Sequence, residues 1–234
     1  MSVTTPLGFR ASGVTAGLKA SGKPDVALVV NDGPHHHAAA VFTTNRVEAA
    51  PVTWSRTVIS DGRADAVVLN SGGANACTGA PGFQDTHRTA EHVGEVLGVA
   101  AGDVVVCSTG LIGERLPMGL LLPGVEAAVE ELSVDGGPAA ATAIMTTDSV
   151  PKTATAVREG WSVGGMAKGA GMLAPALATM LVVITTDAVI EGAHVADDLD
   201  AVLRSATAMT FDRIDSDGCM STNDTVLLLS LIHI

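Results

Sequence analysis

The chain has 234 residues, of which 47% are hydrophobic and 16% charged, a composition typical of a globular rather than a disordered protein. Its formal net charge of −12 argues against nucleic acid as a partner, because no basic patch could offset it. Aromatic residues are scarce, with four Phe, two Trp and no Tyr, so we expect a core of Val, Leu, Ala, Ile and Met.

The cysteines and the N-terminus indicate the compartment. Cys77, Cys107 and Cys219 are far apart and odd in number, which favours reduced thiols over a disulfide framework. Residues 1–9 lack the basic and apolar regions of a signal peptide, and the apolar stretch near Thr179 is far too short to span a bilayer. We therefore expect a cytoplasmic protein that does not associate with membranes.

Short apolar strands alternate with helical patterns, which predicts a layered α/β fold. The first half of the chain predicts strands at 26–30, 38–42, 66–69 and 103–107, with a turn at 31–34 and a Gly-rich loop at 70–75. A helix over 85–97 carries Ala90, Val93 and Leu97 on one face. The strand at 103–107 leads into Ser108-Thr109-Gly110.

The second half predicts a helix over 123–132, a break at 136–138, and a second, Ala-rich helix after the break. It then predicts an alternating strand at 155–163, a Gly-rich loop at 164–171 and strands at 180–185 and 225–230. Between the last two strands, Asp197 or Asp198 would cap a helix with Leu199, Val202, Leu203 and Ala206 on one face. Because a strand needs partners, the apolar ending at 231–234 leads us to expect a fragment of a longer protein.

The segment from Lys168 to Leu181 carries the strongest chemical signal, a Gly-rich stretch that leads through Pro175 into Thr179. A threonine hydroxyl is a poor nucleophile unless a base lies beside it, and an N-terminal threonine supplies one in its own α-amine, with a pKa of about 8. Attack of the Thr179 hydroxyl on the preceding carbonyl, followed by hydrolysis, would break the Ala178–Thr179 bond and free that amine. Threonine is also common at strand starts, so this residue alone does not establish catalysis.

Ser108-Thr109-Gly110 could form an oxyanion site, since a hydroxyl and a glycine N–H can converge where negative charge develops. An ordinary strand-to-loop turn is the alternative. Thr146-Thr147-Asp148 would either cap a turn or bind a polar substrate. Spacing alone does not decide between the alternatives.

Two further patterns are set aside. Lys168 is followed by Gly169 and then by a strand, whereas a phosphate-binding P-loop has Lys-Ser/Thr opening a helix. His35-His36-His37 is typical of a solvated loop, because adjacent residues point in different directions, and we assign no metal there.

Six segments, spread along nearly the whole chain, match motifs of one family and occur in the same order as in that family: 40–46, 70–79, 108–113, 145–148, 168–181 and 215–229. The last of them contains Ser221-Thr222-Asn223-Asp224-Thr225. Together they resemble one family, the bifunctional ornithine acetyltransferases (glutamate N-acetyltransferases) of arginine biosynthesis. The resemblance implies a layered α/β sandwich that cleaves itself.

The same resemblance implies a role for each matching residue. Thr179 would be both the cleavage residue and the nucleophile, with Ala178 on the other side of the bond. Thr109 and Gly110 would form the oxyanion hole, and Thr146, Lys168 and Thr179 would contact substrate. The mature protein would have two chains, 1–178 and a truncated 179–234, that assemble into a hetero-oligomer.

The implied reaction moves an acetyl group from N-acetylornithine to glutamate and releases ornithine. No cofactor is implied, although some members also accept acetyl-CoA. A ping-pong route through an acetyl-threonine ester suits transfer between two amines, because both half-reactions use one oxyanion site. Lys168 would hold a substrate carboxylate or polarise the local field, and we favour the first role.

Family members are markedly longer, and their C-terminal part supplies a glutamate and further polar residues to the substrate pocket. We therefore expect the full-length parent to be the acetyltransferase and the fragment to have little activity. A self-processing aminopeptidase, in which water takes the acyl group, is the nearest alternative. A non-catalytic fragment whose strands pair with partner chains is the second alternative.

Overall fold

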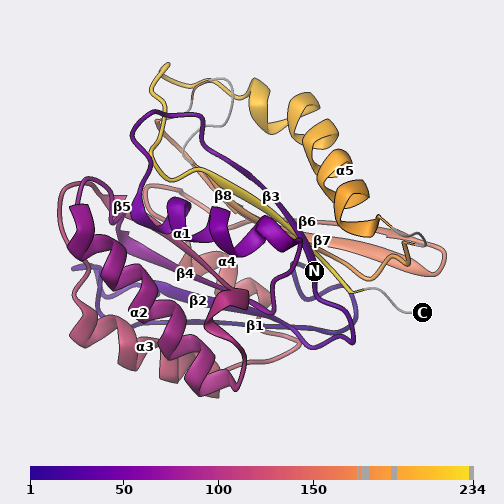
Figure 1. The fold of residues 1–234 in the computed structure, drawn as a ribbon, viewed down its shortest axis with the longest axis horizontal. Coiled ribbons are helices and arrows are strands. Elements are labelled where there is room, and N and C mark those ends of the chain that lie inside the picture. Colours follow the sequence, from indigo (N-terminus) through magenta and orange to yellow (C-terminus); the bar gives the residue numbers. More distant parts are fainter. Residues whose placement is uncertain (173, 175–179, 191–193, 232–234) are drawn as a thin grey trace.

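Two β-sheets form the centre of the structure, a computed structural model that describes residues 1–172, 174, 180–190 and 194–231 (Figure 1). The first sheet has the order β1-β2-β4-β5 and the second the order β3-β9-β8-β7-β6. Neighbouring strands are antiparallel except for the parallel pairs β4–β5 and β8–β9. The strands are β1 Phe9–Val14, β2 Val26–Asn31, β3 His37–Phe42, β4 Ala66–Gly73, β5 Val104–Leu111, β6 Lys152–Arg158, β7 Trp161–Lys168, β8 Leu181–Thr186 and β9 Thr225–Ser230.

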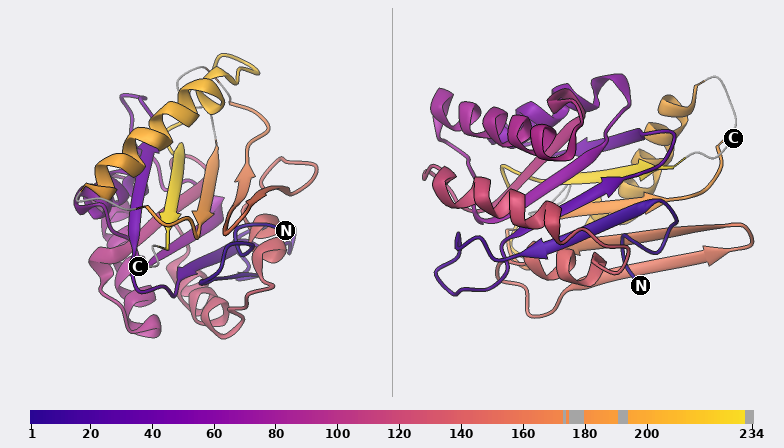
Figure 2. Two further views of the ribbon diagram at one scale, coloured as in Figure 1. Left: turned by 90° about the vertical axis from the view of Figure 1, so that its right-hand side faces the viewer. Right: turned by 90° about the horizontal axis from the view of Figure 1, so that it is seen from below.

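Helices cover the outer faces of both sheets, so the layers run helix, sheet, sheet, helix (Figure 2). Helices α2 and α3 lie on the first sheet and α5 lies on the second. The shorter α1 packs against β5 and β3, and α4 packs mainly against β1, at the two edges of the sandwich. The helices are α1 Ala50–Val58, α2 Gly79–Leu97, α3 Met118–Glu130, α4 Gly137–Ala143 and α5 Val195–Met209, with 3₁₀ turns at Ile59–Asp61, Ala101–Asp103 and Phe211–Arg213.

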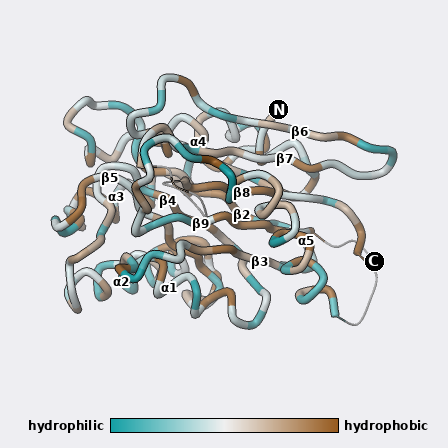
Figure 3. The backbone as a smooth tube through the Cα atoms, turned by 90° about the horizontal axis from the view of Figure 1, so that it is seen from above, coloured by the Kyte–Doolittle hydropathy of each residue, from teal (hydrophilic) through white to brown (hydrophobic). Residues whose placement is uncertain are grey.

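The largest group of buried apolar residues lies between the two sheets. Hydrophobic stretches of the backbone, in brown, run along central strands such as β8 (Figure 3). In β2, Val29 packs into this layer, whereas Leu28 packs outward against the helices. Both faces of the strand are therefore covered, which is why its sequence is a continuous apolar run instead of an alternating one. The predicted layered α/β fold is confirmed.

Strands β8 and β9 occupy the middle of the second sheet, between β7 and β3. The predicted boundary between two chains, at residues 178 and 179, therefore runs through a single sheet. The segment before the boundary contributes β3, β6 and β7, and the segment after it contributes β8 and β9. If the chain is cut there, main-chain hydrogen bonds still join the two pieces along both β7–β8 and β3–β9.

The predictions for residues 155–171 were wrong in two respects. Residues 155–163 are not one strand but parts of the β6–β7 hairpin, which turns at Gly160 with a φ of 84°. Residues 164–168 belong to β7 and not to a loop. A Cβ on Gly164 would lie 2.1 Å from the Ser2 carbonyl oxygen, so this glycine permits close packing rather than a flexible turn.

The helix boundaries also differ from those predicted. The helix predicted to begin at 85 begins at Gly79, and the one predicted at 123 begins at Met118, with Pro123 inside it. The Ala-rich helix begins within the predicted break, at Gly137. The sequence pattern gave no prediction for β1 or α1, and no helix among the described residues is long and apolar enough to cross a membrane.

The predicted cap of α5 was wrong, and its predicted face was confirmed for Leu199 and Leu203 but not for Val202 and Ala206. His194 occupies the N-cap position, and Asp197 and Asp198 lie in the first turn. Leu199, Leu203 and Thr207 form the buried stripe, whereas Val202 is 61% exposed. Leu199, Leu203 and Thr207 are four positions apart and so lie on one face of the helix, whereas Val202 and Ala206 lie beside that face.

Candidate active site

Strand ends from both sheets meet where Lys168 contacts Thr109. Thr109 lies near the end of β5 in the first sheet, and Lys168 is the last residue of β7 in the second. The Lys168 Nζ donates a hydrogen bond of 3.1 Å to Thr109 Oγ1. Both side chains are nearly inaccessible, at 2% and 4% exposure, so this contact lies inside the sandwich. It joins two of the predicted site residues across 59 positions of sequence.

The buried position of Lys168 determines its ionisation. Burial lowers the pKa of the Lys168 ammonium to about 8, because the charged form loses its hydration. The carboxylates of Asp148 and Asp224 oppose this shift, whereas the ammonium groups of Lys152 and Lys19 add to it. Lys168 is therefore still protonated at neutral pH, but close to its titration range.

Asp224 is a buried acid immediately before β9. Its Oδ1 accepts a hydrogen bond of 3.0 Å from the main-chain N–H of Met180, and the residue is 0% exposed. The other oxygen, Oδ2, has no hydrogen-bond partner among the residues that the structure describes. Burial raises the pKa of Asp224 to about 7, against the hydrogen bonds from Met180 and Ser221 and the charge of Lys168. Met180 directly follows Thr179 in sequence, so Asp224 holds the chain next to the predicted nucleophile.

Asp148 ties the 146–148 segment to the end of β7. Its carboxylate accepts hydrogen bonds from the Thr146 N–H at 3.2 Å and the Gly169 N–H at 2.8 Å, and it also pairs with Lys152. Burial alone would raise its pKa, but these hydrogen bonds outweigh burial and the pKa is lowered. Asp148 thus holds this segment against the end of β7, and substrate binding by Thr146 stays a prediction.

Hydrogen bonds from neighbouring loops fix the end of β5. The Ser108 hydroxyl donates to Asn70 Oδ1 at 2.6 Å. The Asn223 side-chain amide donates to the Ser108 carbonyl at 2.9 Å and to the Ala74 carbonyl at 2.6 Å. Asn223 therefore links both sheets at the point where Thr109 is presented.

Gly110 follows Thr109 and pairs with Gly72 at the irregular end of β4. Its φ is 135°, a conformation that favours glycine. A Cβ at this position would lie 2.6 Å from the Gly73 nitrogen. A larger residue would therefore push β5 away from β4.

The 40–46 segment supports the loop that carries Asp224. The Thr43 N–H donates to the Asp224 carbonyl at 2.9 Å, and the Thr43 hydroxyl donates to the Ser221 carbonyl at 2.7 Å. The Asn45 side chain reaches the Met220 carbonyl at 3.2 Å. This segment, singled out by its sequence, acts on the site through the backbone of a loop nearly 180 residues away.

The predicted site residues are thus only partly brought together. Thr109 and Lys168 are in contact, and Gly110 is next to Thr109. Thr146 is exposed and reaches the cluster through Asp148. The predicted cleavage residues Ala178 and Thr179 lie outside the described residues.

Sequence reasoning treated Asp148 only as part of a turn or a polar substrate contact, and it gave no individual role to Asn223 or Asp224. The signal available for the last two was a pair of strongly polar residues directly before an apolar strand, where burial forces each polar group to find a partner.

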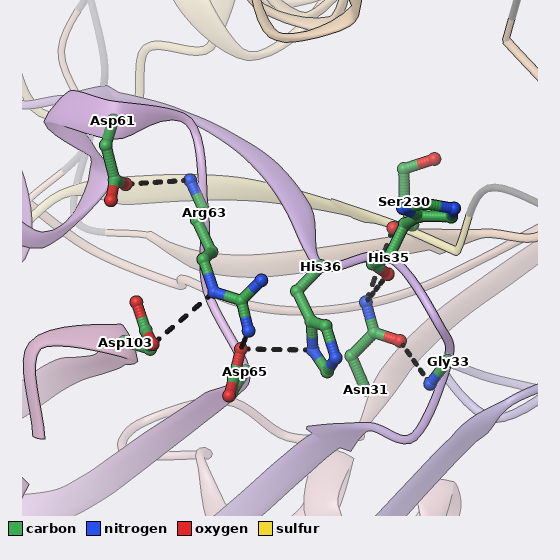
Figure 4. Close-up of polar contacts among 9 residues, drawn as sticks. All are labelled: Asn31, Gly33, His35, His36, Asp61, Arg63, Asp65, Asp103 and Ser230. Carbon is green, nitrogen blue, oxygen red and sulfur yellow. Dashed lines mark hydrogen bonds and ion pairs between the residues drawn. The ribbon is translucent and has the colours of Figure 1, made fainter. Parts of the chain in front are cut away.

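The three consecutive histidines lie at the opposite ends of the strands, where β3 begins and β9 ends. The expectation of a solvated loop was wrong for His36, whose Nδ1 lies 3.1 Å from Asp65 Oδ1 (Figure 4). Arg63 donates to the same carboxylate at 2.8 Å and lies 3.4 Å from Asp103. Asn31 joins this end to β9 through the Ser230 carbonyl. These contacts join the two sheets at the end of the sandwich opposite Lys168 and Thr109.

Comparison with known proteins finds relatives that match nearly the whole chain. The sequence profile of the ArgJ family matches residues 10–233. The arginine biosynthesis bifunctional protein ArgJ of Streptomyces coelicolor is 68% identical over 230 residues, which are 98% of this chain and 59% of that protein. The protein of the same name from Mycobacterium leprae is 62% identical over 236 residues, which are 97% of this chain and 57% of that protein. This chain therefore spans under three-fifths of the length of these relatives, which confirms that family members are markedly longer.

Solved structures show the same relationship. The ornithine acetyltransferase of Mycobacterium tuberculosis, solved with ornithine, has a TM-score of 0.74 and 56% identity, covering 77% of this chain and 96% of that chain. The Bacillus halodurans ArgJ protein has a TM-score of 0.68 and 35% identity, with 77% and 95% coverage. An aminopeptidase of Ochrobactrum anthropi shares the fold alone, at 14% identity and a TM-score of 0.57.

Proposed function

This chain belongs to the ArgJ family, and from that premise we propose that it carries the nucleophile of an enzyme that transfers an acetyl group from N-acetylornithine to glutamate. The observation that carries the proposal is the buried contact between Lys168 and Thr109. It brings two ordered sequence motifs together beside the start of β8, where Lys168 pairs with Leu181, two residues after Thr179. The ornithine bound to the M. tuberculosis relative supports the substrate class.

The proposed pathway begins with self-cleavage. The Thr179 hydroxyl attacks the Ala178 carbonyl carbon, the C–N bond breaks, and the acyl group moves to the threonine oxygen. Water then hydrolyses that ester, which leaves residues 1–178 and a second chain whose N-terminal residue is Thr179. The freed α-amine becomes the base of the transferase reaction.

In the transfer reaction, the Thr179 hydroxyl attacks the acetyl carbonyl while the α-amine takes its proton. Negative charge develops on the carbonyl oxygen, and the Thr109 hydroxyl and Gly110 N–H would stabilise it. The C–N bond to ornithine breaks, the α-amine returns the proton to the leaving amine, and an acetyl-threonine ester remains. The glutamate amine then attacks this ester and regenerates the threonine hydroxyl.

Several accompanying roles are part of the same proposal. Thr146 and Lys168 contact substrate, and the exposure of Thr146 supports its role.

No cofactor is needed, because the nucleophile, base and oxyanion donors are all protein groups, and acetyl-CoA would serve only as a second acetyl donor. The cleaved chains associate into a hetero-oligomer. The location is cytoplasmic, consistent with Cys77, Cys107 and Cys219 being free thiols.

Intact mass under denaturing conditions tests the cleavage. We expect two species, residues 1–178 and 179–234, and a single species in the Thr179→Ala variant. Thr153→Ala, a change at an exposed threonine of β6, is the matched control and should be cut normally. A wild-type chain that stays intact, or a Thr179→Ala chain that is still cut, would contradict the proposal.

Product analysis separates the proposed transferase from an aminopeptidase that shares this fold. With N-acetylornithine as donor, a transferase forms N-acetylglutamate when glutamate is present. An aminopeptidase-type hydrolase releases free acetate at the same rate with or without glutamate.

A further inference from the structure

The hydrogen bond between Lys168 and Thr109 determines where the threonine hydroxyl can point. An ammonium group has three donors and no acceptor, so in this 3.1 Å contact Thr109 Oγ1 must be the acceptor. A hydroxyl that accepts from one side keeps its own hydrogen for another partner. With Lys168 charged, the Thr109 hydrogen is therefore directed away from the lysine.

The surroundings of Lys168 keep it charged despite its burial. The carboxylates of Asp148, after α4, and Asp224, before β9, raise the pKa of Lys168, whereas the ammonium groups of Lys152 of β6 and Lys19 of the β1–β2 loop lower it. Both acids are held in place by main-chain amides, those of Thr146 and Gly169 for one and that of Met180 for the other. Asp148, whose pKa is lowered, thus supplies a constant negative charge near this buried cation, and Asp224 adds to it once it ionises above a pH of about 7.

We infer that Lys168 is a positioning residue: as an ammonium it donates to Thr109 and thereby directs the Thr109 O–H toward the oxyanion of the reacting acyl group. This inference rests on the proposed function and assigns Lys168 a role that needs no substrate carboxylate. A neutral lysine amine can accept a hydrogen bond, so loss of its proton lets the Thr109 hydroxyl turn toward it. The oxyanion would then lose one of its two donors.

A neutral ester distinguishes this role from carboxylate binding. p-Nitrophenyl acetate has neither a carboxylate nor an amine, and it acetylates Thr179 Oγ with release of p-nitrophenolate. Acetylation at residue 179 is localised by mass. The Thr179-dependent rate is the total rate of p-nitrophenolate release minus the rate of release by Thr179→Ala. If Lys168 only holds a substrate carboxylate, its removal leaves this rate unchanged.

The variants are Lys168→Met, Thr109→Ala and the double variant, all in the full chain. We expect Lys168→Met to slow Thr179 acetylation roughly 10- to 100-fold, at or below the loss seen when one oxyanion donor is removed. In the Thr109→Ala background the same change should cost less than about 2-fold, because its only effect is through the missing hydroxyl. Lys23→Met, the same substitution at an exposed lysine, is the control and should leave the rate unchanged.

The pH profile gives a second measurement if Lys168→Met does not fold. The wild-type rate should fall above a pH of about 8 as Lys168 loses its proton, and Thr109→Ala should lack this fall. Asp148, Asp224, Lys152 and Lys19 all face Lys168 and are the same in both proteins, so a fall that they caused would appear in both.

Each outcome decides the inference. Non-additive losses, or an alkaline fall that requires Thr109, support it. A Lys168→Met rate within about 2-fold of wild type on the neutral ester, or additive losses, overturns it while leaving the proposed function intact. Acetylation that is the same in Thr179→Ala overturns the proposed function and this inference together.

Discussion

The carboxylate of Asp224 accepts a hydrogen bond of 3.0 Å from the main-chain amide of Met180, so the residue before β9 holds the residue that leads into β8. The two strands are parallel neighbours, and Leu181 pairs with Thr225 at this end. The buried Asp224 side chain thus joins the two chain segments just before the strands begin, as main-chain hydrogen bonds join β8 and β9 farther along. It also fixes the chain next to the proposed nucleophile.

Removal of the Asp224 carboxylate should therefore destabilise the fold. Asp224→Ala leaves the buried Met180 N–H without its acceptor, and we expect a loss of about 1–3 kcal/mol in the free energy of unfolding. Asp224→Asn keeps an acceptor of the same shape and should lose less. Urea unfolding measures both, with Asp135→Ala, at an exposed turn, as the neutral control. Equal stability of Asp224→Ala and wild type would show that this hydrogen bond is dispensable.

The raised pKa of Asp224 predicts the pH dependence of stability. The group has a pKa of about 7 in the folded protein and an ordinary value near 3.8 when unfolded. Between these two values the folded state binds more protons, so its stability falls as pH rises from about 4 to about 7. Asp224→Asn should remove this contribution. Urea unfolding at several pH values in this window, taken as the difference between wild type and variant, checks it, and a constant difference would contradict the raised pKa.

Gly110 should tolerate no side chain. Gly110→Ala places a Cβ 2.6 Å from the Gly73 nitrogen at a φ of 135°, so β5 must move away from β4. We expect a loss of about 1–3 kcal/mol in unfolding free energy, from strain and steric overlap together. Gly113→Ala is the matched control, because it too has a positive φ, 90°, but no atom within 4 Å of its Cβ. A loss in Gly110→Ala no larger than in the control would show that β5 and β4 can separate freely.

The two pieces produced by the proposed cleavage should stay together under native conditions. Strands β8 and β9 are bonded to β7 on one side and to β3 on the other, and Leu181, Val183, Leu227 and Leu229 are buried between the sheets. Separation would expose this apolar surface to water. Size-exclusion chromatography should show co-elution of 1–178 and 179–234 in buffer and two peaks in denaturant. Separate elution in buffer would mean that the second sheet does not survive the cut.

The sequence alone was sufficient for the elements whose pattern is local. The apolar run of β2 and the periodic face of α2 were predicted correctly. A strand buried on both faces is apolar at every position, and a helix buried on one face is apolar at a helical period, so both patterns can be seen in the sequence. The order of six motifs was enough to identify the family. It also pointed to Thr109, Gly110 and Lys168 as site residues.

Only the tertiary structure decided what those residues do to one another. Gly164 was predicted to lie in a loop because glycine is common in loops. The sequence does not show that the Ser2 backbone occupies the space where a side chain of residue 164 would lie. Lys168 and Thr109 are 59 positions apart and meet only because β7 and β5 end at the same side of two packed sheets. The ionisation of Lys168 and Asp224 depends on burial and on charges from four other parts of the chain. Electrostatic energy depends on the distance between charges in space, and the number of residues between two charges in the sequence does not give that distance.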